Sequence, residues 1–268
     1  MKRSKNILYH DKIAPIYDEI YESSVYWIYN RKITWHYLKS ILNNLDKKAK
    51  ILDLGCGSGY WGFKLIKSGF DVYFADISQQ MINEVREKAE NLNIDLSGKT
   101  FAIEAEKIDS IFEKEFFNLI IAYGDILSFT ANPFNLLKII RRLLVDGGIF
   151  IGTADNFFSA IEFYLKKGDE SELKDFLSTG VTFWLSKNKN FNFRIKTFTY
   201  DELMKLFKKT NFEVIRFYSK PLIPLKNYID NFSEDFILNG LLKMEIKLQM
   251  QNQNIGIGNH FEFFLKKV

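Results

Sequence analysis

Between residues 50 and 155 the chain alternates short apolar runs with longer stretches in which apolar and polar residues recur at helical spacing. The short runs, rich in branched and aromatic residues, predict strands. The longer stretches predict amphipathic helices, as in the stripe of Met81, Ile82, Val85 and Ala89. Strands joined through helices form a parallel sheet that is covered on both faces, so the alternation indicates an α/β fold. The expected strands are residues 50–54, 71–77, 100–104, 117–123 and 149–154.

Single residues with known preferences mark several boundaries of these elements. Ser78 is a suitable N-cap for the helix after the second strand, and Pro133 opens the helix after the fourth. Gly69 is a suitable end for the first helix. Gly147 and Gly148 are expected to end the helix that precedes the fifth strand.

Outside this block the pattern predicts further helices, three more strands and a long insertion. Residues 7–45 and 156–180 are expected to be helical. A strand is expected at 192–198, a helix introduced by Thr199 at 201–208, and the last two strands at 212–219 and 261–267. A hairpin between the last two strands would need only ~2–5 residues, so the long segment between them is an insertion.

We therefore expect one domain over residues 1–268, with a Rossmann-like, doubly wound, seven-stranded and mostly parallel sheet. Its expected parts are a helical N-terminal cap (1–45), a core (46–155), a first insertion (156–185), a further core segment (186–220), a second insertion (221–260) and the last strand (261–268). Insertions usually carry specificity, so the two inserted segments are expected to recognise a ligand.

Composition limits the kinds of protein that this chain can be. Apolar residues make up 47% of the 268 residues and charged residues 26%, as in folded globular chains. The net charge of +4 is spread along the chain, so nucleic acid is not expected as a partner. No apolar run approaches the ~20 residues that span a bilayer or the ~7–15 of a secretory signal. With the single cysteine Cys56, we expect a cytoplasmic protein without membrane association or internal disulfide.

A glycine-rich turn follows the first strand and is the main candidate for ligand binding. Asp53 ends the strand, and Gly55, Gly57 and Gly59 follow it, where glycine lets a ligand approach the backbone closely. Together with Gly62, two of these glycines also fit the G-x-G-x-x-G motif of dinucleotide-binding enzymes, so an NAD-dependent oxidoreductase is one alternative.

The carboxylates near this turn favour a different ligand. In the dinucleotide interpretation Asp53 would lie close to the pyrophosphate, where like charge is unfavourable. A ligand that is positively charged near the turn fits better. Asp76, at the end of the second strand, can accept hydrogen bonds from both hydroxyls of a ribose, with Ile77 beside the adenine ring. S-adenosylmethionine combines these properties.

Five motifs in order resemble the class I S-adenosylmethionine-dependent methyltransferases of the small-molecule type, similar to the type 11/25 and glycine N-methyltransferase-like group. They are ILDLGCGSGYWG (51–62), ADIS (75–78) with Met81, EAE (104–106), FNLIIAYGD (117–125) and LLVDGGIFIG (143–152). The resemblance covers most of residues 10–220 and the final strand. It implies a methyltransferase with S-adenosyl-L-methionine as its cofactor.

The resemblance also implies a set of cofactor-binding residues. Asp53, Gly55, Cys56, Gly57 and Gly59 would hold the methionine portion, Asp76 the ribose, Ile77 and Met81 the faces of the adenine, and Glu104 and Ala105 its edge, where the family more often has Asp. Tyr123 would offer its backbone to the amino group, Arg31 would pair with the carboxylate, and Tyr17 and Tyr21 would be aromatic residues of the covering cap.

The catalytic candidates lie at the ends of the fourth and fifth strands, where ligands of open α/β sheets bind. Methyl transfer depends on positioning and on exclusion of water, and it needs a base only if the acceptor carries a proton. Asp125, and Asp155 with Asn156, are candidates for orienting or deprotonating the acceptor. No metal site is expected, because the three histidines, including His260, show no metal-ligand spacing and are expected at the surface or in the core.

The hypothesis favoured by the sequence is a methyltransferase that acts on a small-molecule acceptor. Aromatic residues of the two insertions either form local cores or line an apolar substrate pocket. One alternative is an RNA or protein methyltransferase, which would need a contiguous basic surface. Another is a non-catalytic protein that binds S-adenosylmethionine, which would need no enclosed cavity beside the sulfonium. The oligomeric state is left open.

Overall fold

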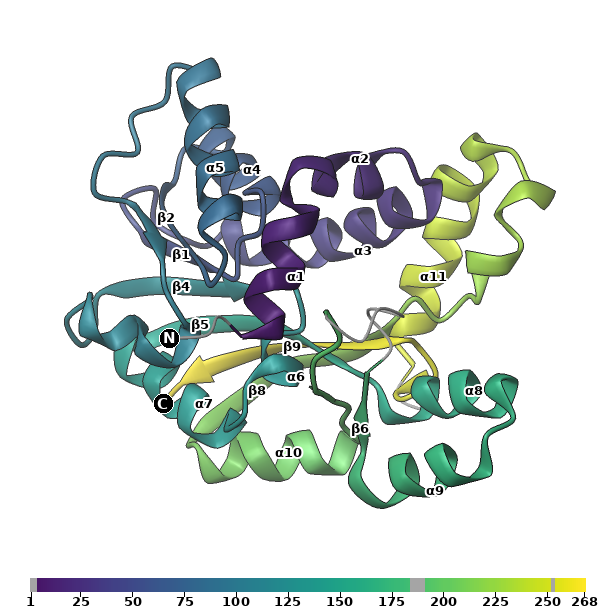
Figure 1. The fold of residues 1–268 in the computed structure, drawn as a ribbon. Helices are drawn as coiled ribbons and strands as arrows, with labels where there is room; N and C mark the ends of the chain where they lie inside the picture. Colours follow the sequence, from purple (N-terminus) through teal and green to yellow (C-terminus); the bar gives the residue numbers. More distant parts are fainter. Residues whose placement is uncertain (1–3, 184–190, 252–253) are drawn as a thin grey trace.

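A central seven-stranded sheet organises the computed structural model of the chain, which describes residues 4–183, 191–251 and 254–268 (Figure 1). The strand order is β3-β2-β1-β4-β5-β9-β8. β9 runs antiparallel to both of its neighbours, and the remaining strands run parallel to one another. The bounds are β1 Lys50–Leu54, β2 Asp71–Asp76, β3 Thr100–Ala102, β4 Phe117–Ala122, β5 Leu144–Asp155, β8 Phe212–Lys220 and β9 His260–Lys267. The predicted doubly wound, mostly parallel α/β fold is thus confirmed.

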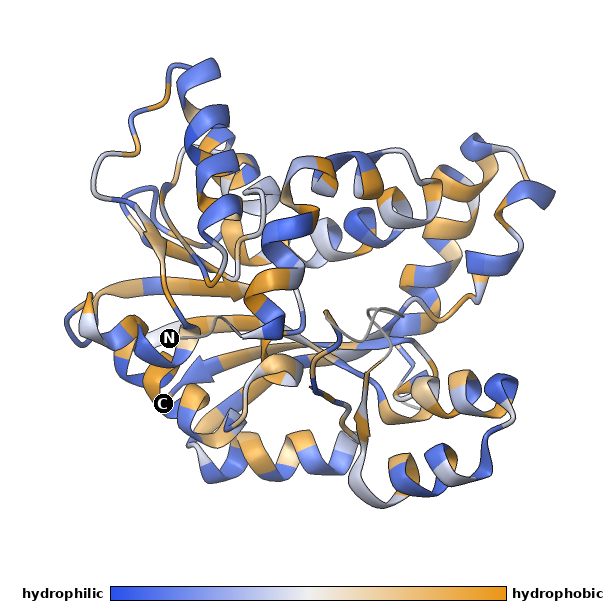
Figure 2. Ribbon diagram, viewed as in Figure 1, coloured by the Kyte–Doolittle hydropathy of each residue, from blue (hydrophilic) through white to orange (hydrophobic). Residues whose placement is uncertain are grey.

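Helices pack on both faces of the sheet, as the alternating pattern predicts. α3, α4 and α5 cover one face and α7 and α10 the other (Figure 1). Apolar residues concentrate in the sheet, whereas the outer helices alternate apolar and polar positions (Figure 2). The helices are α1 Lys5–Ile13, α2 Tyr17–Glu22, α3 Val25–Leu42, α4 Tyr60–Lys67, α5 Gln79–Asn91, α6 Ile126–Phe129, α7 Pro133–Leu143, α8 Phe157–Lys167, α9 Glu170–Thr179, α10 Tyr200–Lys209 and α11 Leu242–Gln249.

The predicted helix starts are confirmed by their capping hydrogen bonds. The Met81 N–H donates to the Ser78 hydroxyl at 3.1 Å, which is the N-cap interaction of α5. Pro133 is the first residue of α7. Thr199 and Glu202 form a reciprocal capping box at the start of α10. In each case a local side chain satisfies a backbone donor that the helix itself leaves free.

Two predicted boundaries are wrong. β5 begins at Leu144, not at residue 149, because Leu144 already pairs with Phe117, and Gly147 and Gly148 lie within an irregularity of the strand. The strand expected at 192–198 is reduced to β7 Ile195–Lys196, which pairs with β6 Val181–Thr182 in a separate two-stranded sheet. The place beside β5 in the main sheet is taken by β9. The expected boundary between residues 185 and 186 lies outside the described residues.

Helices occupy the segments expected as the cap and the two insertions, and buried polar contacts join the second insertion to the cap. α1 to α3 form the cap, and α8 and α9 form the helical pair of the first insertion. In the second insertion, α11 lies beside α3 (Figure 1). The fully buried Glu245 of α11 accepts hydrogen bonds from the Leu222 N–H at 2.7 Å and the Tyr29 hydroxyl at 3.1 Å. The second insertion is therefore anchored to the cap. Among the described residues, no helix has the length and apolarity to cross a membrane.

Close packing between α4 and β2 explains the last glycine of the G-x-G-x-x-G pattern. Gly62 lies on the buried face of α4, and a Cβ on it would come within 2.0 Å of Cε1 of Phe74. Gly62 therefore allows α4 to pack closely on β2. This packing role explains the glycine whether or not the protein binds a dinucleotide.

We expect Gly62→Ala to lower the free energy of unfolding by about 1–3 kcal/mol, because the new methyl group overpacks the core. Urea denaturation measures the change. Lys67→Ala, at an exposed position of the same helix, is the matched control and should change stability far less. Equal stability of the two variants would contradict the packing argument.

Candidate functional site

The turn between β1 and α4 has a backbone that only glycine adopts readily. Gly55, Gly57 and Gly59 have φ angles of +67°, +53° and +90°. The N–H groups of Gly55 and Cys56 both donate to the carbonyl of Ala75, at 2.7 and 3.1 Å. A Cβ on Gly55 would lie 2.4 Å from Cδ1 of Ile126. The three glycine positions of this turn therefore disfavour any residue with a side chain.

Two buried carboxylates, predicted as ligand contacts, flank the turn. The Gly62 N–H donates to Asp53 Oδ2 at 2.8 Å, and the Gly57 N–H donates to Asp76 Oδ2 at 2.9 Å. Burial is the main cause that raises the pKa of Asp53 to about 7. The hydrogen bond from the Gly62 N–H lowers this pKa, and the charge of Asp76 raises it. Burial also raises the pKa of Asp76.

No ion pair joins either carboxylate to a cation within residues 4–183, 191–251 and 254–268. A positively charged ligand would supply the missing counter-charge, so this pair fits the cationic cofactor that the sequence predicts. Burial, together with these two carboxylates, raises the pKa of the Cys56 thiol, in agreement with an inert filler in the turn.

The cap closes directly over this turn. Tyr17 Cε1 lies 3.2 Å from the position that a Cβ on Gly57 would take. Asp11 accepts a hydrogen bond from the Ser78 hydroxyl at 2.6 Å. Asp18 accepts one from the Ser58 hydroxyl and forms an ion pair with Lys88. Two cap carboxylates therefore tie α1 and α2 to the loops after β1 and β2.

The predicted cap residues lie next to one another. The rings of Tyr17 and Tyr21 have centroids 4.7 Å apart. The Arg31 guanidinium lies 3.6 Å from the ring centroid of Tyr60, the first residue of α4, and pairs with Glu22 at 4.0 Å. Arg31 is thus at the junction of cap and turn, as a carboxylate-binding role would require.

The other predicted cofactor residues lie along the same edge of the sheet. Met81 is fully buried on the inner face of α5, and Ile77 is half-buried after β2. Glu104 pairs with Lys107 at 2.9 Å, so its carboxylate already has a partner. The ring of Tyr123, after β4, lies against Trp61 with centroids 4.9 Å apart. Ala105 is half-buried at the start of a short 3₁₀ turn.

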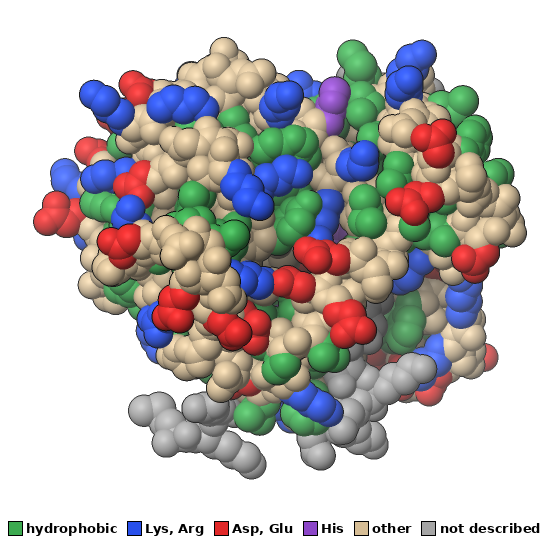
Figure 3. Space-filling view, turned by 90° about the horizontal axis from the view of Figure 1, so that it is seen from above, with side chains coloured by type: hydrophobic (Ala, Val, Ile, Leu, Met, Phe, Trp, Pro, Cys, Tyr) green, Lys and Arg blue, Asp and Glu red, His purple; other side chains and the backbone are tan. Residues whose placement is uncertain are grey.

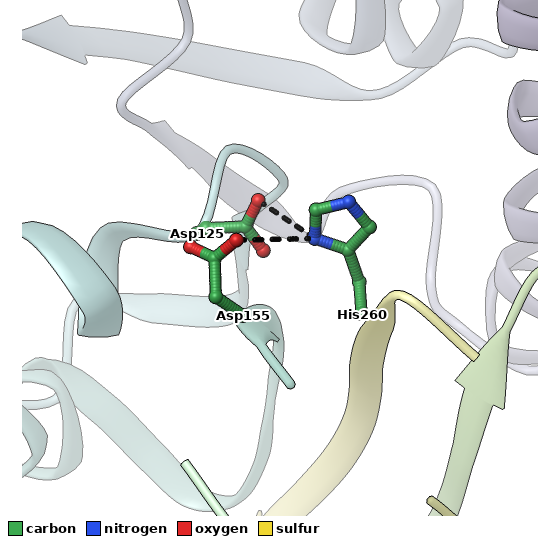
Figure 4. Close-up of side chains that lie close together, drawn as sticks. All are labelled: Asp125, Asp155 and His260. Atoms are coloured by element: carbon green, nitrogen blue, oxygen red, sulfur yellow. Dashed lines mark ion pairs between the residues drawn. The ribbon is translucent and has the colours of Figure 1, made fainter. Parts of the chain in front are cut away.

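Both predicted catalytic residues lie together with a histidine that the sequence analysis placed elsewhere (Figure 4). His260 Nδ1 is 3.2 Å from Asp125 Oδ2 and 3.9 Å from Asp155 Oδ1. Asp125 follows β4, Asp155 ends β5, and His260 begins β9. Asp155 and His260 are cross-strand partners in the antiparallel pair. The sequence predicts no role for His260 at the site, and the structure brings it into contact with both aspartates.

Backbone contacts fix the two aspartates. Asp125 has a φ of +56°, and its N–H donates to the Thr153 hydroxyl at 3.1 Å. The Asp155 N–H donates to the Ser128 hydroxyl at 2.9 Å. Asn156 is turned away from the cluster, because its Nδ2 donates to the carbonyls of Gly256 and Gly258 and its Oδ1 accepts from Phe158 N. Asn156 therefore holds loops in place and does not face an acceptor.

Burial and the mutual charges of the cluster shift the pKa values of all three side chains. Burial, together with the charge of the neighbouring Asp125, raises the pKa of Asp155 to about 7. Burial acts in the same direction on Asp125, but the charge and hydrogen bond of His260 lower its pKa below the usual range. Burial lowers the pKa of His260, yet the attraction of Asp125 raises it on balance.

An acid–base cluster is the interpretation that fits the contact of the imidazole with the carboxylates. The three donor atoms lie within 4.8 Å of one another. The ion pair turns Nδ1 of His260 toward the carboxylate of Asp125.

A cavity of 990 Å³ opens over the cluster, and its walls combine aromatic residues with charged and polar ones. The cap, α6, α8 and the second insertion supply its aromatic wall residues, which include Tyr9, Tyr17, Tyr21, Tyr26, Trp27, Phe129, Phe158, Phe163 and Tyr228. The aromatic residues of the first insertion were expected either to form a local core or to line a pocket, and different residues do each. Phe158 and Phe163 line the cavity, while Tyr164 and Phe176 form a small local core.

Comparison with known proteins shows a methyltransferase domain. The family model described as "Methyltransferase domain" matches residues 51–148. The chain is 25% identical over 215 residues to an uncharacterized protein of Methanocaldococcus jannaschii, covering 77% of this chain and 76% of the relative. It is 27% identical over 118 residues to a tRNA 5-carboxymethoxyuridine methyltransferase of Escherichia coli, covering 44% of each chain. The match therefore spans less than half of the length of that enzyme.

A solved structure shares the fold over most of the chain. An S-adenosylmethionine-dependent methyltransferase from Methanosarcina mazei superposes with a TM-score of 0.59 and 21% identity, covering 85% of this chain and 96% of that one. At this identity the likeness concerns the arrangement of the elements.

The buried Asp53 makes a prediction about stability. Its pKa is about 7 in the folded chain against about 3.9 in an unfolded chain. As the pH rises between these values, the unfolded state ionises first, so the folded state loses stability that is fully present below pH 4. Asp53→Asn removes this loss and keeps an acceptor for the Gly62 N–H. We expect the stability of the variant relative to wild type to rise by about 4 kcal/mol between pH 4 and pH 8.

Urea denaturation at several pH values measures this difference. Asp230→Asn, at an exposed position of the second insertion, controls for the change of side chain. A gain for Asp53→Asn that is the same at pH 4 and pH 8 would show that burial of a titrating carboxyl is not its cause.

Proposed function

Because the chain is a class I S-adenosylmethionine-dependent methyltransferase, we propose that it methylates a small molecule bound in the cavity over Asp125, Asp155 and His260. The observation that carries this proposal is the position of the cavity. Its walls include Tyr17, Tyr21 and Gly124, which belong to or adjoin the predicted cofactor residues, and also the acid–base cluster. The cavity thus reaches the cap side of the predicted cofactor site and also holds groups that can accept a proton.

The residues on the cofactor side have the properties that S-adenosylmethionine requires. We propose that the buried Asp53 and Asp76 face its positive methionine end and its ribose, and that Arg31 pairs with its carboxylate. Tyr17 then covers the ligand from the cap side. The bound cofactor supplies an electrophilic methyl group on a sulfonium, and the cap and the insertions exclude water from it.

His260 is the proposed general base for an acceptor that carries a proton. Its Nδ1 faces Asp125, and its Nε2 has no hydrogen-bond partner among the residues that the structure describes. Because the imidazole lines the cavity, Nε2 can take the proton of an acceptor hydroxyl or amine. The ionised Asp125 then stabilises the imidazolium that forms, as a carboxylate does in other histidine-dependent sites. Asp155, whose Oδ1 lies 3.9 Å from Nδ1, also stabilises the imidazolium when it is ionised.

The electrostatics of the cavity favour a small molecule over RNA as acceptor. The cavity contains the acidic groups of the cluster. Of the two lysines on its wall, Lys166 is paired with Glu162 at 2.5 Å, and the Lys226 ammonium lies 5.9 Å from the ring centroid of Tyr26. On the face seen in Figure 3, positive and negative side chains are interspersed. RNA binding calls for contiguous positive charge. The tRNA methyltransferase among the relatives keeps RNA as the alternative that an experiment must test. The cavity beside the predicted cofactor residues also favours catalysis over cofactor binding alone.

The proposed cofactor contacts can be tested by calorimetric titration with S-adenosylhomocysteine. We expect micromolar binding to the wild type, loss of at least tenfold in affinity for Asp76→Ala, and no binding of NAD. Asp76→Asn keeps acceptors for Gly57 N and Ser78 N and serves as the control for turn structure. Unchanged affinity in both variants would remove Asp76 from the cofactor site.

The proposed base can be tested by following transfer of labelled methyl groups into the small-molecule, RNA and protein fractions of a cell extract. We expect label in the small-molecule fraction, a rate that rises with pH as His260 loses its proton, and a fall of about 10²–10⁴-fold for His260→Asn. Asp125→Asn and Asp155→Asn should also lower turnover. His36→Asn, at an exposed position outside the cavity, is the matched control.

The binding of S-adenosylhomocysteine should be the same in His260→Asn and wild type. Full turnover in the His260 and aspartate variants would exclude the cluster from catalysis. Label in RNA alone would replace the small-molecule proposal by the RNA alternative.

A further inference from the structure

A buried ion pair lies at the base of the methyl-transfer site, and no step described so far uses it. Lys220, the last residue of β8, pairs with Glu262 of β9. The side chains are 9% and 0% exposed. The Lys220 ammonium also contacts the Thr34 hydroxyl, which donates to Glu262 Oε2 at 3.0 Å. Three elements, β8, β9 and the cap helix α3, therefore meet in this network.

The pairing of the strands places this network next to the acid–base cluster. Lys220 is the cross-strand partner of His260 in the β8–β9 pair. Glu262 is the cross-strand partner of Thr153, whose hydroxyl accepts the Asp125 N–H. The Lys220 ammonium also lies 5.6 Å from the ring centroid of Tyr123. The ion pair is therefore a direct neighbour of His260, of the Thr153 that holds Asp125, and of Tyr123 at the predicted cofactor edge.

Stability alone does not account for the burial of these charges. Taking an ion pair out of water costs several kcal/mol per ion, and apolar replacements of such pairs are often neutral or stabilising. The network is also incompletely satisfied. The Glu262 Oε1 atom and the hydroxyls of Tyr123 and Tyr218 are buried without hydrogen-bond partners within the described ranges. A costly, unsaturated arrangement next to a reactive cluster indicates a role in that cluster.

We propose that Lys220 is a positioning residue whose buried ammonium, held by Glu262 and Thr34, provides a fixed positive charge that keeps His260 free to accept a proton. This inference rests on the proposed function. Two carboxylates by themselves would hold the imidazole in its protonated form, in which it cannot act as a base. A cation on the adjacent strand opposes this effect. In agreement with the geometry, Lys220 lowers the pKa of both His260 and Asp125.

The charged groups around His260 come from all elements that pack on it. Asp125 and Asp155 face it from the ends of β4 and β5, and Lys220 from β8. Across the cavity, Glu162 and Lys166 of α8 pair with each other, and the second insertion contributes Lys226. The cap and the second insertion also contribute ionisable side chains, which are Tyr9, His10, Tyr17, Tyr21, Tyr26 and Tyr228. Lys220 is thus the cation that acts on His260 from within the sheet.

The titration of the His260 imidazole, followed by NMR on histidine-labelled protein, tests the inference without knowledge of the acceptor. The chain has three histidines, and His260→Asn assigns the signal. Lys220→Met with Glu262→Gln removes both charges and avoids a lone buried ion, so the double variant should fold. We expect the midpoint of the His260 titration to move to higher pH in the double variant. In Lys220→Arg, which keeps the charge, it should stay near the wild-type position.

The rate of methyl transfer provides the second measurement. The acidic limb of kcat/KM should move to higher pH with the NMR midpoint in the double variant and stay in place in Lys220→Arg. An NMR midpoint in the double variant that equals the wild-type value would overturn the inference. A midpoint that moves while the limb of kcat/KM does not would retain the effect of Lys220 on His260 and refute the proposed role of His260 as base.

Discussion

The insertion of β9 between β5 and β8 is the constraint on which the proposed site depends. A parallel sheet brings only the carboxyl ends of its strands to the ligand edge. Because β9 runs the other way, its amino end reaches that edge and places His260 beside Asp125 and Asp155. The same pairing sets Lys220 next to His260. One reversed strand therefore converts a cofactor-binding edge into one with an imidazole, two carboxylates and a buried cation.

Several carboxyl groups are buried along this edge, and their burial lowers the stability of the fold. Asp53 and Asp76 lie under the cap without ion pairs among the described residues, and Asp155 lies against a second carboxylate. Water would solvate such groups better than protein does. They are suited to a cationic ligand on one side of the edge and to proton transfer on the other. Burial of these carboxyl groups lowers the stability of the fold, and the same groups would favour cofactor binding and proton transfer.

Local signals were sufficient where a feature depends on neighbours in sequence. Ser78 and Thr199 cap helices because the donors they satisfy are two or three residues away. The glycine turn is recognisable because its backbone excludes other residues. The errors concern pairing at long range. The segment expected as a strand at 192–198 lost its place in the main sheet to β9, and the irregular pairing of β4 with β5 moved the start of β5.

The sequence by itself determined the α/β fold, the glycine turn, the motifs of an S-adenosylmethionine-dependent methyltransferase, and two of the three residues in the acid–base cluster. Only the tertiary structure decided that His260 joins them, that Asn156 turns away, and that cap, α8 and second insertion enclose one cavity. The reason is that capping and turn preferences act over a few residues. A cluster built from residues 125, 155 and 260 exists only after the strands that carry them have paired.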